Sequence, residues 1–222
     1  MRIVHYEKVD STNDTIKSLV KTHGHPLMVS ADFQTSGRGR QGAVWHASPG
    51  KNLLCSVFHP DIATNESALF IAALCIGDTL DTLGINHFFK LPNDVYVDNK
   101  KIAGILIEAL SDGRIIIGMG LNVLESLDGH RKATSIYEHS DIDIHLSTLR
   151  SRLASHFMQR SMQDRRILFN EFKAKCALNK HKVTLANTPL TLYNFDEHFM
   201  CETSKGRLPC THLNFETTSA NE

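Results

Sequence analysis

Short runs of apolar residues alternate with turn-forming residues through the first half of the chain and predict a series of strands. Two pairs of these runs are separated by Asp98-Asn99 and by Ser111-Asp112-Gly113, which are typical hairpin turns. Turns this short favour antiparallel pairing, because a parallel crossover needs about a dozen residues or more. The predicted strands are residues 3–6, 27–32, 52–59, 88–90, 95–97, 102–109 and 114–123.

Apolar residues at helical spacing occupy three other stretches. The first follows the polar residues 10–14, which offer several N-cap candidates, and carries Ile16, Leu19 and Val20 along one face. The other predicted helices are residues 67–83 and residues 145–176, the latter with a break near residues 161–164.

The order of these elements predicts an α+β fold. Residues 182–215 alternate short β-like runs with turns and indicate a small module separate from the rest. We therefore expect a mixed, largely antiparallel sheet with helices packed on it in a domain of residues 1–178, followed by a small β module of residues 179–222.

Composition narrows the function classes. The chain has 222 residues, of which 41% are hydrophobic, so it can bury a core. Lys plus Arg and Asp plus Glu each number 24, which gives a net charge of zero and argues against a general nucleic-acid binder. The charged N-terminus is no signal peptide, and no apolar run approaches the roughly 20 residues that span a membrane. We expect a cytoplasmic protein without a membrane or nucleic-acid partner.

The cysteines fit this expectation. They are widely spaced and form no CxxC pair, so we expect free thiols in a reducing compartment rather than disulfides or a zinc site. They are Cys55, Cys75, Cys176, Cys201 and Cys210.

The hexapeptide GRGRQG at residues 37–42 is the most informative segment. Glycine lets a backbone approach a ligand closely, and arginine suits a phosphate or carboxylate. The spacing also matches the GxGxxG dinucleotide fingerprint, but that motif needs a helix starting inside the glycine turn. Residues 43–52 contain Pro49 and Gly50 and show no helical period, and no Gly-Lys-Ser/Thr follows for a P-loop. Alone, the segment is either an anion-binding loop or a solvated surface loop.

Two further clusters carry candidate chemistry. The turn KLPND at residues 90–94 leads into a strand, and Lys101 begins the next strand, which contains Gly104. Glycine weakens a strand unless a ligand or another backbone comes close. Gly118 and Gly120 alternate in a later strand and free one of its faces, although a bulged strand would look similar.

Taken together, these motifs resemble the biotin–protein ligase family. Four motifs occur in the family's order, and the resemblance covers residues 1 to about 125 with specific motifs and the remainder in outline. It implies a class II synthetase-like catalytic domain and an SH3-like C-terminal module. No helix-turn-helix precedes Ser11, so the chain is similar to the single-function form and we expect no operator binding. The four motifs are STN at residues 11–13, Gln34 with GRGR…W through Trp45, KLPND…KIAGILIE at residues 90–108 and GMGLNV at residues 118–123.

The resemblance implies an ATP-dependent ligase. Biotin and MgATP would give biotinoyl-5′-AMP and pyrophosphate, and a lysine on a biotin carboxyl carrier domain, such as that of acetyl-CoA carboxylase, would then attack the mixed anhydride. Because the first step brings a carboxylate against a triphosphate, positioning and positive charge should carry catalysis. Exposed strand edges would allow a homodimer.

The resemblance also implies roles for individual residues. Lys101, Arg40 and Asp94 are the implied catalytic residues. Asp94 would hold Mg²⁺ or orient the acceptor amine, and the sequence leaves both roles open. The residues implied in binding biotin or its adenylate are Ser11, Thr12, Asn13, Gln34, Gly37, Arg38, Gly39, Arg40, Lys101, Gly104 and Leu106. Those implied in binding ATP are Trp45, Lys90, Asn93 and Asn122.

Two expectations concern shape and motion. The glycines near positions 104 and 118–120 should leave room for the apolar bicycle of biotin. The loop of residues 35–47 should be mobile when empty and ordered around the reactive adenylate, because closure keeps water away.

Departures from the family pattern leave rival functions to test. Leu91 stands where the family has tryptophan, and Gln41 and Ala43 stand where some members have further arginines. A lipoate- or octanoyl-transferring ligase would share the fold, and a biotin-binding module without turnover would share the pocket. The GRGR and KLPND motifs favour biotin, and the presence of Arg40, Lys101 and Asp94 favours catalysis.

Overall fold

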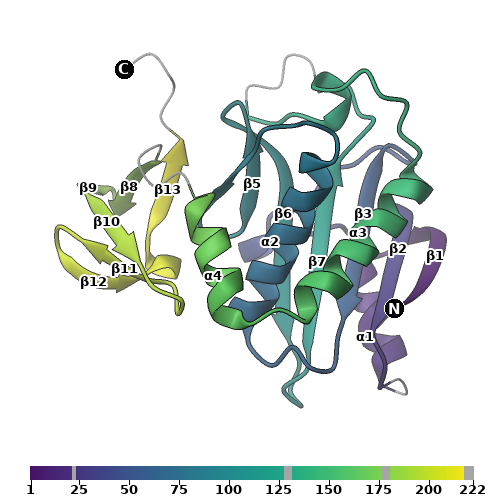
Figure 1. The fold of residues 1–222 in the computed structure, drawn as a ribbon, viewed down its shortest axis with the longest axis horizontal. Coiled ribbons are helices and arrows are strands. Elements are labelled where there is room, and N and C mark those ends of the chain that lie inside the picture. Colours follow the sequence, from purple (N-terminus) through teal and green to yellow (C-terminus); the bar gives the residue numbers. More distant parts are fainter. Residues whose placement is uncertain (22–23, 128–131, 177–180, 218–222) are drawn as a thin grey trace.

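A seven-stranded sheet forms the centre of the computed structural model, which describes residues 1–21, 24–127, 132–176 and 181–217 (Figure 1). Its strands lie in the order β1-β2-β3-β7-β6-β5-β4. β1 and β2 run parallel, and every other neighbouring pair is antiparallel, which confirms the predicted sheet. The strands are β1 (Arg2–Val9), β2 (Leu27–Gln34), β3 (Asn52–Phe58), β4 (Phe88–Lys90), β5 (Asp94–Val97), β6 (Lys100–Ala109) and β7 (Ile115–Asn122).

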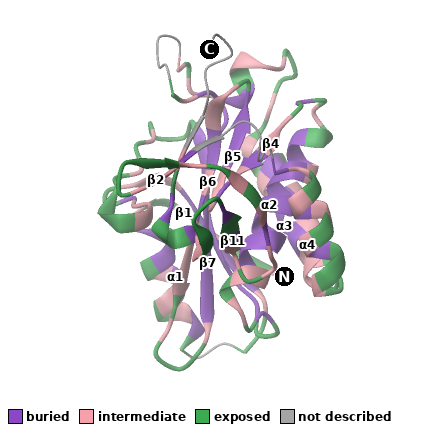
Figure 2. Cartoon of the chain, turned by 90° about the vertical axis from the view of Figure 1, so that its left-hand side faces the viewer, coloured by how far each residue is buried: buried purple, intermediate pink, exposed green. Residues whose placement is uncertain are grey.

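The described residues form four α-helices, which cover the two faces of the sheet (Figure 1). α1 packs on one face, where Ile16 and Val20 meet Val29 and Ile116 in a small core. α2 lies on the other face beneath α3 and α4, and for this reason it is apolar around nearly its whole circumference. Figure 2 shows the result, with β7 buried along most of its length. The helices are α1 (Thr12–Val20), α2 (Asn65–Asp81), α3 (Leu146–Ser161) and α4 (Arg165–Ala174).

The predicted hairpins and helix break are confirmed. Asp98 and Asn99 have φ values of 46° and 62°, the left-handed values that a tight hairpin turn requires between β5 and β6. The predicted long helix of residues 145–176 breaks after Ser161, and Asp164 caps the following helix by accepting a hydrogen bond from the Arg166 N–H.

The C-terminal residues form a module of two three-stranded sheets. A cluster of aromatic rings joins it to the main domain: Phe70 of α2 and Phe172 of α4 have centroids 5.2 Å apart, and Phe199 of the module lies 5.4 Å from Phe70. Phe195 is also fully buried in this cluster. The predicted boundary between residues 178 and 179 lies outside the described residues. The module contains β8 (His181–Leu185), β9 (Thr188–Leu190), β10 (Leu192–Phe195), β11 (Met200–Thr203), β12 (Gly206–Pro209) and β13 (Asn214–Thr217).

The prediction of five free thiols is wrong for two cysteines. Cys201 of β11 and Cys210 form a disulfide with their Cα atoms 5.7 Å apart. The hairpin of β11 and β12 brings these two residues together, although eight residues separate them in sequence. Cys55, Cys75 and Cys176 are free and buried, and burial raises the pKa of the Cys55 thiol to about 12. None of the described helices is long and apolar enough to cross a membrane.

Candidate functional site

A cavity of about 340 Å³ opens where four parts of the fold meet. These parts are the start of α1, the loop between β2 and β3, the turn between β4 and β5, and the C-terminal module. The structure brings most of the predicted site residues to this one cavity. They are Ser11, Thr12, Asn13, Gln34, Arg38, Gly39, Arg40, Trp45, Lys90, Asn93, Asp94, Lys101, Gly104 and Leu106.

Two predicted site residues do not line the cavity. Asn122 is buried on β7, and its side-chain amide donates a hydrogen bond to the backbone oxygen of Thr134 at 3.0 Å. Gly37 lies in the loop, where its carbonyl accepts a hydrogen bond from the Trp45 N–H and an added Cβ would lie 2.9 Å from the Trp45 carbonyl. Both residues therefore support the surroundings of the cavity.

One wall of the cavity is neutral and rich in hydrogen-bonding groups. The N–H and hydroxyl of Thr12 both donate to Oε1 of Gln34, at 2.7 and 3.0 Å. The buried Ser56 hydroxyl lies 2.7 Å from Oγ1 of Thr12 and 2.5 Å from Oδ1 of Asn13. Ser11 is the N-cap of α1 and makes no side-chain capping bond. The first turn of α1 thus directs its polar side chains to the cavity.

Three glycines of β6 and β7 make room for protein side chains. A Cβ at Gly118 would lie 2.5 Å from Oδ1 of Asn13. A Cβ at Gly104 or Gly120 would lie 2.9 or 2.6 Å from the ring of Trp45. In this structure Asn13 and Trp45 occupy the space that these glycines leave. The expectation that the glycines make room for the bicycle of biotin stays a prediction.

The Trp45 ring packs over Gly104 of β6 and Gly120 of β7. Nζ of Lys101 lies 5.4 Å from the centre of its ring, within the range of a cation–π contact. Its Nε1 atom is buried and has no hydrogen-bond partner among the described residues. A buried donor without a partner is unfavourable, so this N–H is available to an acceptor on a bound ligand.

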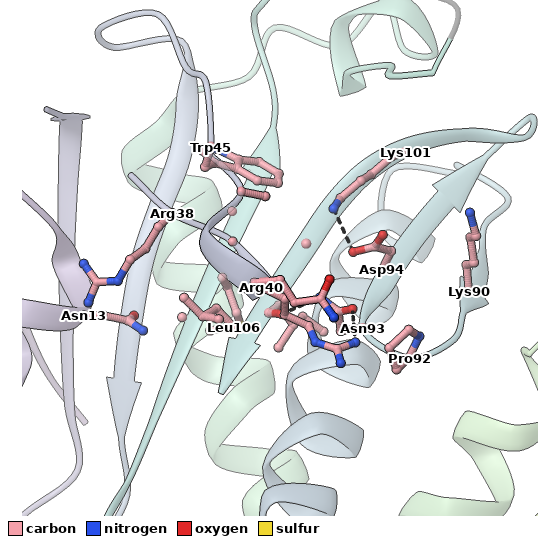
Figure 3. Close-up of a pocket in the computed structure, with 18 of the residues that line it drawn as sticks. Asn13, Arg38, Arg40, Trp45, Lys90, Pro92, Asn93, Asp94, Lys101 and Leu106 are labelled. Atoms are coloured by element: carbon pink, nitrogen blue, oxygen red, sulfur yellow. Dashed lines mark hydrogen bonds and ion pairs between the residues drawn. The ribbon is translucent and has the colours of Figure 1, made fainter. Parts of the chain in front are cut away.

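The opposite wall carries the charged groups (Figure 3). Nζ of Lys101 pairs with Oδ1 of Asp94 at 2.7 Å. Arg40 donates to Oδ1 of Asn93 at 3.2 Å, and the Asn93 amide donates to the carbonyl of Ile105 at 2.8 Å, which fixes the turn against β6. Lys90 donates to the Tyr96 hydroxyl at 3.2 Å.

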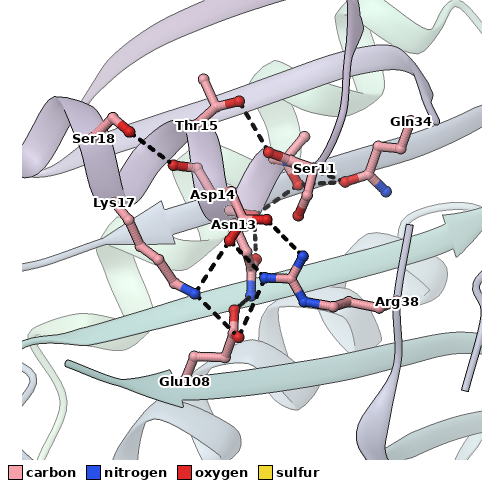
Figure 4. Close-up of polar contacts among 11 residues, drawn as sticks. Ser11, Asn13, Asp14, Thr15, Lys17, Ser18, Gln34, Arg38 and Glu108 are labelled. Atoms are coloured by element: carbon pink, nitrogen blue, oxygen red, sulfur yellow. Dashed lines mark hydrogen bonds and ion pairs between the residues drawn. The ribbon is translucent and has the colours of Figure 1, made fainter. Parts of the chain in front are cut away.

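A second charged group ties the loop to the other side of the cavity (Figure 4). Arg38 donates two hydrogen bonds of 2.6 Å to the Asp14 carboxylate and lies 3.4 Å from Glu108. Lys17 contacts the same two carboxylates at 3.3 and 3.1 Å. The hydrogen bond from Arg38 is the largest influence lowering the pKa of Asp14.

Sequence reasoning missed several groups around the cavity. Ser56 and Glu108 support Asn13, and a lone serine in the apolar run of β3 was the available signal for the first. Glu108 belongs to the KIAGILIE motif but had no assigned role. The C-terminal module adds a third side of the lining, which no local sequence pattern indicated. The residues that it contributes are Cys210, Thr211, Leu213, Asn214 and Phe215.

Residues 6–123 match the model of the biotin/lipoate A/B protein ligase family, which is more than half of the chain. The chain belongs to this family. The matched residues include the part of the cavity lining that runs from the first turn of α1 to the middle strands β6 and β7.

Curated relatives agree with this membership. The chain is 32% identical to the bifunctional ligase/repressor BirA of Bacillus subtilis over 130 residues, which are 54% of this chain and 40% of that protein. It is 31% identical to the biotin–[acetyl-CoA-carboxylase] ligase of Paracoccus denitrificans over 130 residues, or 54% of each protein. The aligned part thus spans about half or less of these relatives.

Solved structures share the whole fold. The biotin protein ligase of Aquifex aeolicus in complex with biotin and ATP has a TM-score of 0.83 at 20% identity and covers 98% of this chain and 99% of its own. The Leishmania major biotin protein ligase in complex with biotinyl-5-AMP has a TM-score of 0.69 at 23% identity, with 99% of both chains covered. The likeness to these two structures therefore extends over the C-terminal module.

Proposed function

We propose that this protein is an ATP-dependent biotin–protein ligase. It would activate biotin as biotinoyl-5′-AMP and transfer the biotinoyl group to a lysine of a biotin carboxyl carrier domain, such as that of acetyl-CoA carboxylase. The observation that carries the proposal is a single cavity with a neutral polar wall on one side and Lys101, Arg40 and Asp94 on the other.

The neutral wall suits the ureido ring of biotin. That ring has two N–H donors and one carbonyl acceptor and no charge, and Ser11, Thr12, Asn13 and Gln34 offer matching uncharged groups. A charged wall would have to be desolvated against a neutral ring, which is unfavourable. We assign this end of the cavity to the ring and the Lys101 end to the carboxylate.

The charged wall suits adenylation. The biotin carboxylate must approach the α-phosphate of ATP, and the two anions repel each other. Lys101 lies where one ammonium group would reach both anions, and Arg40 would add a second positive charge over the phosphates. Trp45, Lys90 and Asn93 are the proposed contacts of the nucleotide. Gly37 and Asn122 are left out of the direct contacts because neither lines the cavity.

Asp94 has two proposed uses. It is the one carboxylate among the described lining residues, and a single carboxylate together with phosphate oxygens is a usual ligand set for Mg²⁺. Asp94 would hold the ion, and Mg²⁺ would neutralise phosphate charge. Alternatively, Asp94 would accept a hydrogen bond from the acceptor lysine and orient its amine toward the mixed anhydride, whose breakdown forms the amide and releases AMP.

A direct assay tests the proposal. Purified protein is incubated with MgATP and either biotin or lipoate while pyrophosphate release is followed, and a carrier domain is then added and weighed by mass spectrometry. We expect pyrophosphate with biotin, none with lipoate, and a carrier heavier by one biotinoyl group. Pyrophosphate release with lipoate would identify a lipoate ligase instead, and biotin binding without pyrophosphate would identify a binding module.

A further inference from the structure

The two arginines of the GRGR segment make different contacts. Arg40 lies near the tip of the loop, where its guanidinium donates a hydrogen bond of 3.2 Å to Oδ1 of Asn93. Arg38 points the other way, toward α1 and β6 (Figures 3 and 4). Arg38 and Arg40 therefore have different surroundings, although they are the same residue type and only one residue lies between them.

Arg38 is already paired with carboxylates. Its two terminal nitrogens donate to the two oxygens of Asp14 at 2.6 Å each, the bidentate geometry that suits a guanidinium best. The Glu108 carboxylate lies 3.4 Å from the same guanidinium. Lys17 contacts both Asp14 and Glu108, so the cluster holds two positive and two negative charges. A substrate anion would have to displace Asp14 to reach this guanidinium.

The same cluster touches the neutral wall of the cavity. Glu108 accepts a hydrogen bond from the side-chain amide of Asn13, which the Ser56 hydroxyl also contacts. Glu108 therefore lies between the loop anchor at Arg38 and the proposed ring site at Asn13. A change in the loop can reach the ring site through this one carboxylate.

The loop is held by its two legs. Residues 37–45 form a small hairpin, in which Gly39 donates to the Ala43 carbonyl and Trp45 donates to the Gly37 carbonyl. One leg is fixed by Arg38 to α1, and the other by Trp45 over Gly104 and Gly120. The tip between the legs contains Gln41 and Gly42 with φ values of 54° and 76° and carries Arg40 across the cavity.

We propose that Asp14 and Glu108 are positioning residues that hold Arg38 as the fixed end of the loop of residues 37–45, which we call the active-site loop. Arg38 then acts on the reaction through the loop, while Arg40 meets the phosphates. This inference rests on the proposed function. It assigns to Asp14, a residue outside the family motif STN, a role in placing Arg40 over the adenylate.

A double-mutant cycle tests the assignment. Asp14→Asn, Arg38→Gln and the double variant are compared with wild type for adenylate formation, measured as pyrophosphate release, and for the KM of ATP and biotin. Asp112→Asn is the control, because two nitrogens of Arg114 donate to Oδ2 of Asp112 on the β6–β7 hairpin and Asp112 lies outside the cavity lining. Melting temperatures confirm that each variant is folded.

If Asp14 anchors Arg38, the two single variants should lose equal amounts of activity, and the losses should not add in the double variant. Each single variant should lower kcat about threefold to tenfold with little change in either KM, and the double variant should be no slower than the singles. Glu108→Gln should additionally raise the KM for biotin, because it also releases Asn13. The inference is overturned if Arg38→Gln raises the KM of ATP or biotin more than about tenfold while Asp14→Asn remains like wild type.

Hydrogen exchange gives a readout that does not depend on activity. Amides of residues 36–46 should lose protection equally in Asp14→Asn and Arg38→Gln and keep it in Asp112→Asn. If wild type forms no adenylate, the proposed function fails, but this comparison still tests the anchor. Unchanged protection in Asp14→Asn would refute the anchor even in an active enzyme.

Discussion

At the scale of single residues, small side chains determine where large ones lie. The missing Cβ atoms of Gly104 and Gly120 admit the Trp45 ring, and that of Gly118 admits Asn13. The sequence indicated correctly that something packs on these glycines, because glycine weakens a strand otherwise. It could not distinguish a ligand from another part of the chain, since both need the same free space.

Gly120→Ala should expel Trp45 from its place. The added Cβ would lie 2.6 Å from Cε2 of the ring, closer than real Cβ atoms approach, so the ring or the strand must move. Trp45 is the one tryptophan of the chain, and its emission should shift to longer wavelength as the ring becomes solvated. Gly24→Ala, where a Cβ meets nothing within 4 Å, should leave the emission unchanged. An unshifted Gly120→Ala spectrum would contradict this packing role.

Lys101→Ala should abolish most adenylation without unfolding the protein. The variant removes the ammonium that we place between the two reacting anions and leaves Asp94 unpaired, which adds negative charge near the phosphates. Loss of one such electrostatic group lowers kcat on the order of 10²- to 10³-fold. Pyrophosphate release measures the effect, and Lys100→Ala, next along the chain and outside the cavity lining, is the control. Near-normal release in the Lys101 variant would remove it from the reaction.

At the scale of elements, hydrophobic spacing was a reliable guide and loop conformation was not. The strand of residues 88–90 was predicted with its observed bounds, and the break between α3 and α4 was placed correctly. These features follow from local periodicity and from polar residues that interrupt it. The sides to which Arg38 and Trp45 turn depend instead on partners 24 to 75 residues away, such as Asp14 and Gly120, so no local pattern encodes them.

The active-site loop should respond to ligands more than any strand of the sheet. At its tip, Arg40 donates a single long hydrogen bond to Asn93, whereas Arg38 and Trp45 anchor its two legs. We expect amides of residues 39–43 to gain protection from hydrogen exchange when biotin and MgATP are added, with the central strands unchanged. Arg40→Gly should remove this gain and let the adenylate escape, which would appear as biotinylation of unrelated lysines. Equal protection with and without ligands would defeat the idea of closure.

At the scale of the whole molecule, buried histidines make stability depend on pH. The His87 side chain is 1% exposed between α2 and α4, and burial, followed by the nearby Lys175, lowers its pKa below 6.5. The unfolded chain therefore binds a proton at a higher pH than the folded chain, so the free energy of unfolding should fall as pH drops from about 7 through 6.5. His87→Gln should flatten this dependence in urea titrations at pH 7.5 and 5.5. His25→Gln, at an exposed position, is the control.

The C-terminal module completes the cavity and depends on aromatic packing for its position. Phe195 is 1% exposed and meets Phe169, Phe172 and Phe199, so Phe195→Ala should lower the free energy of unfolding by about 3–5 kcal/mol. Tyr193 lies on the same strand with 64% of its surface exposed, and Tyr193→Ala should change stability by less than about 0.5 kcal/mol. Urea unfolding measures both variants.

The two variants should also differ in activity. This difference shows whether the position of the module shapes the site or only stabilises the fold. Thr211 and Asn214 of the module line the cavity. If the module moves because its aromatic contacts are lost, these two residues move away from the cavity. At a temperature where both variants are fully folded, Phe195→Ala should raise the KM for ATP while Tyr193→Ala matches wild type. Addition of saturating biotin and MgATP should restore part of the lost stability in Phe195→Ala, because ligand binds the assembled cavity and not the displaced module. A destabilised Phe195 variant with wild-type KM would show that the module adds stability to the fold without shaping the site.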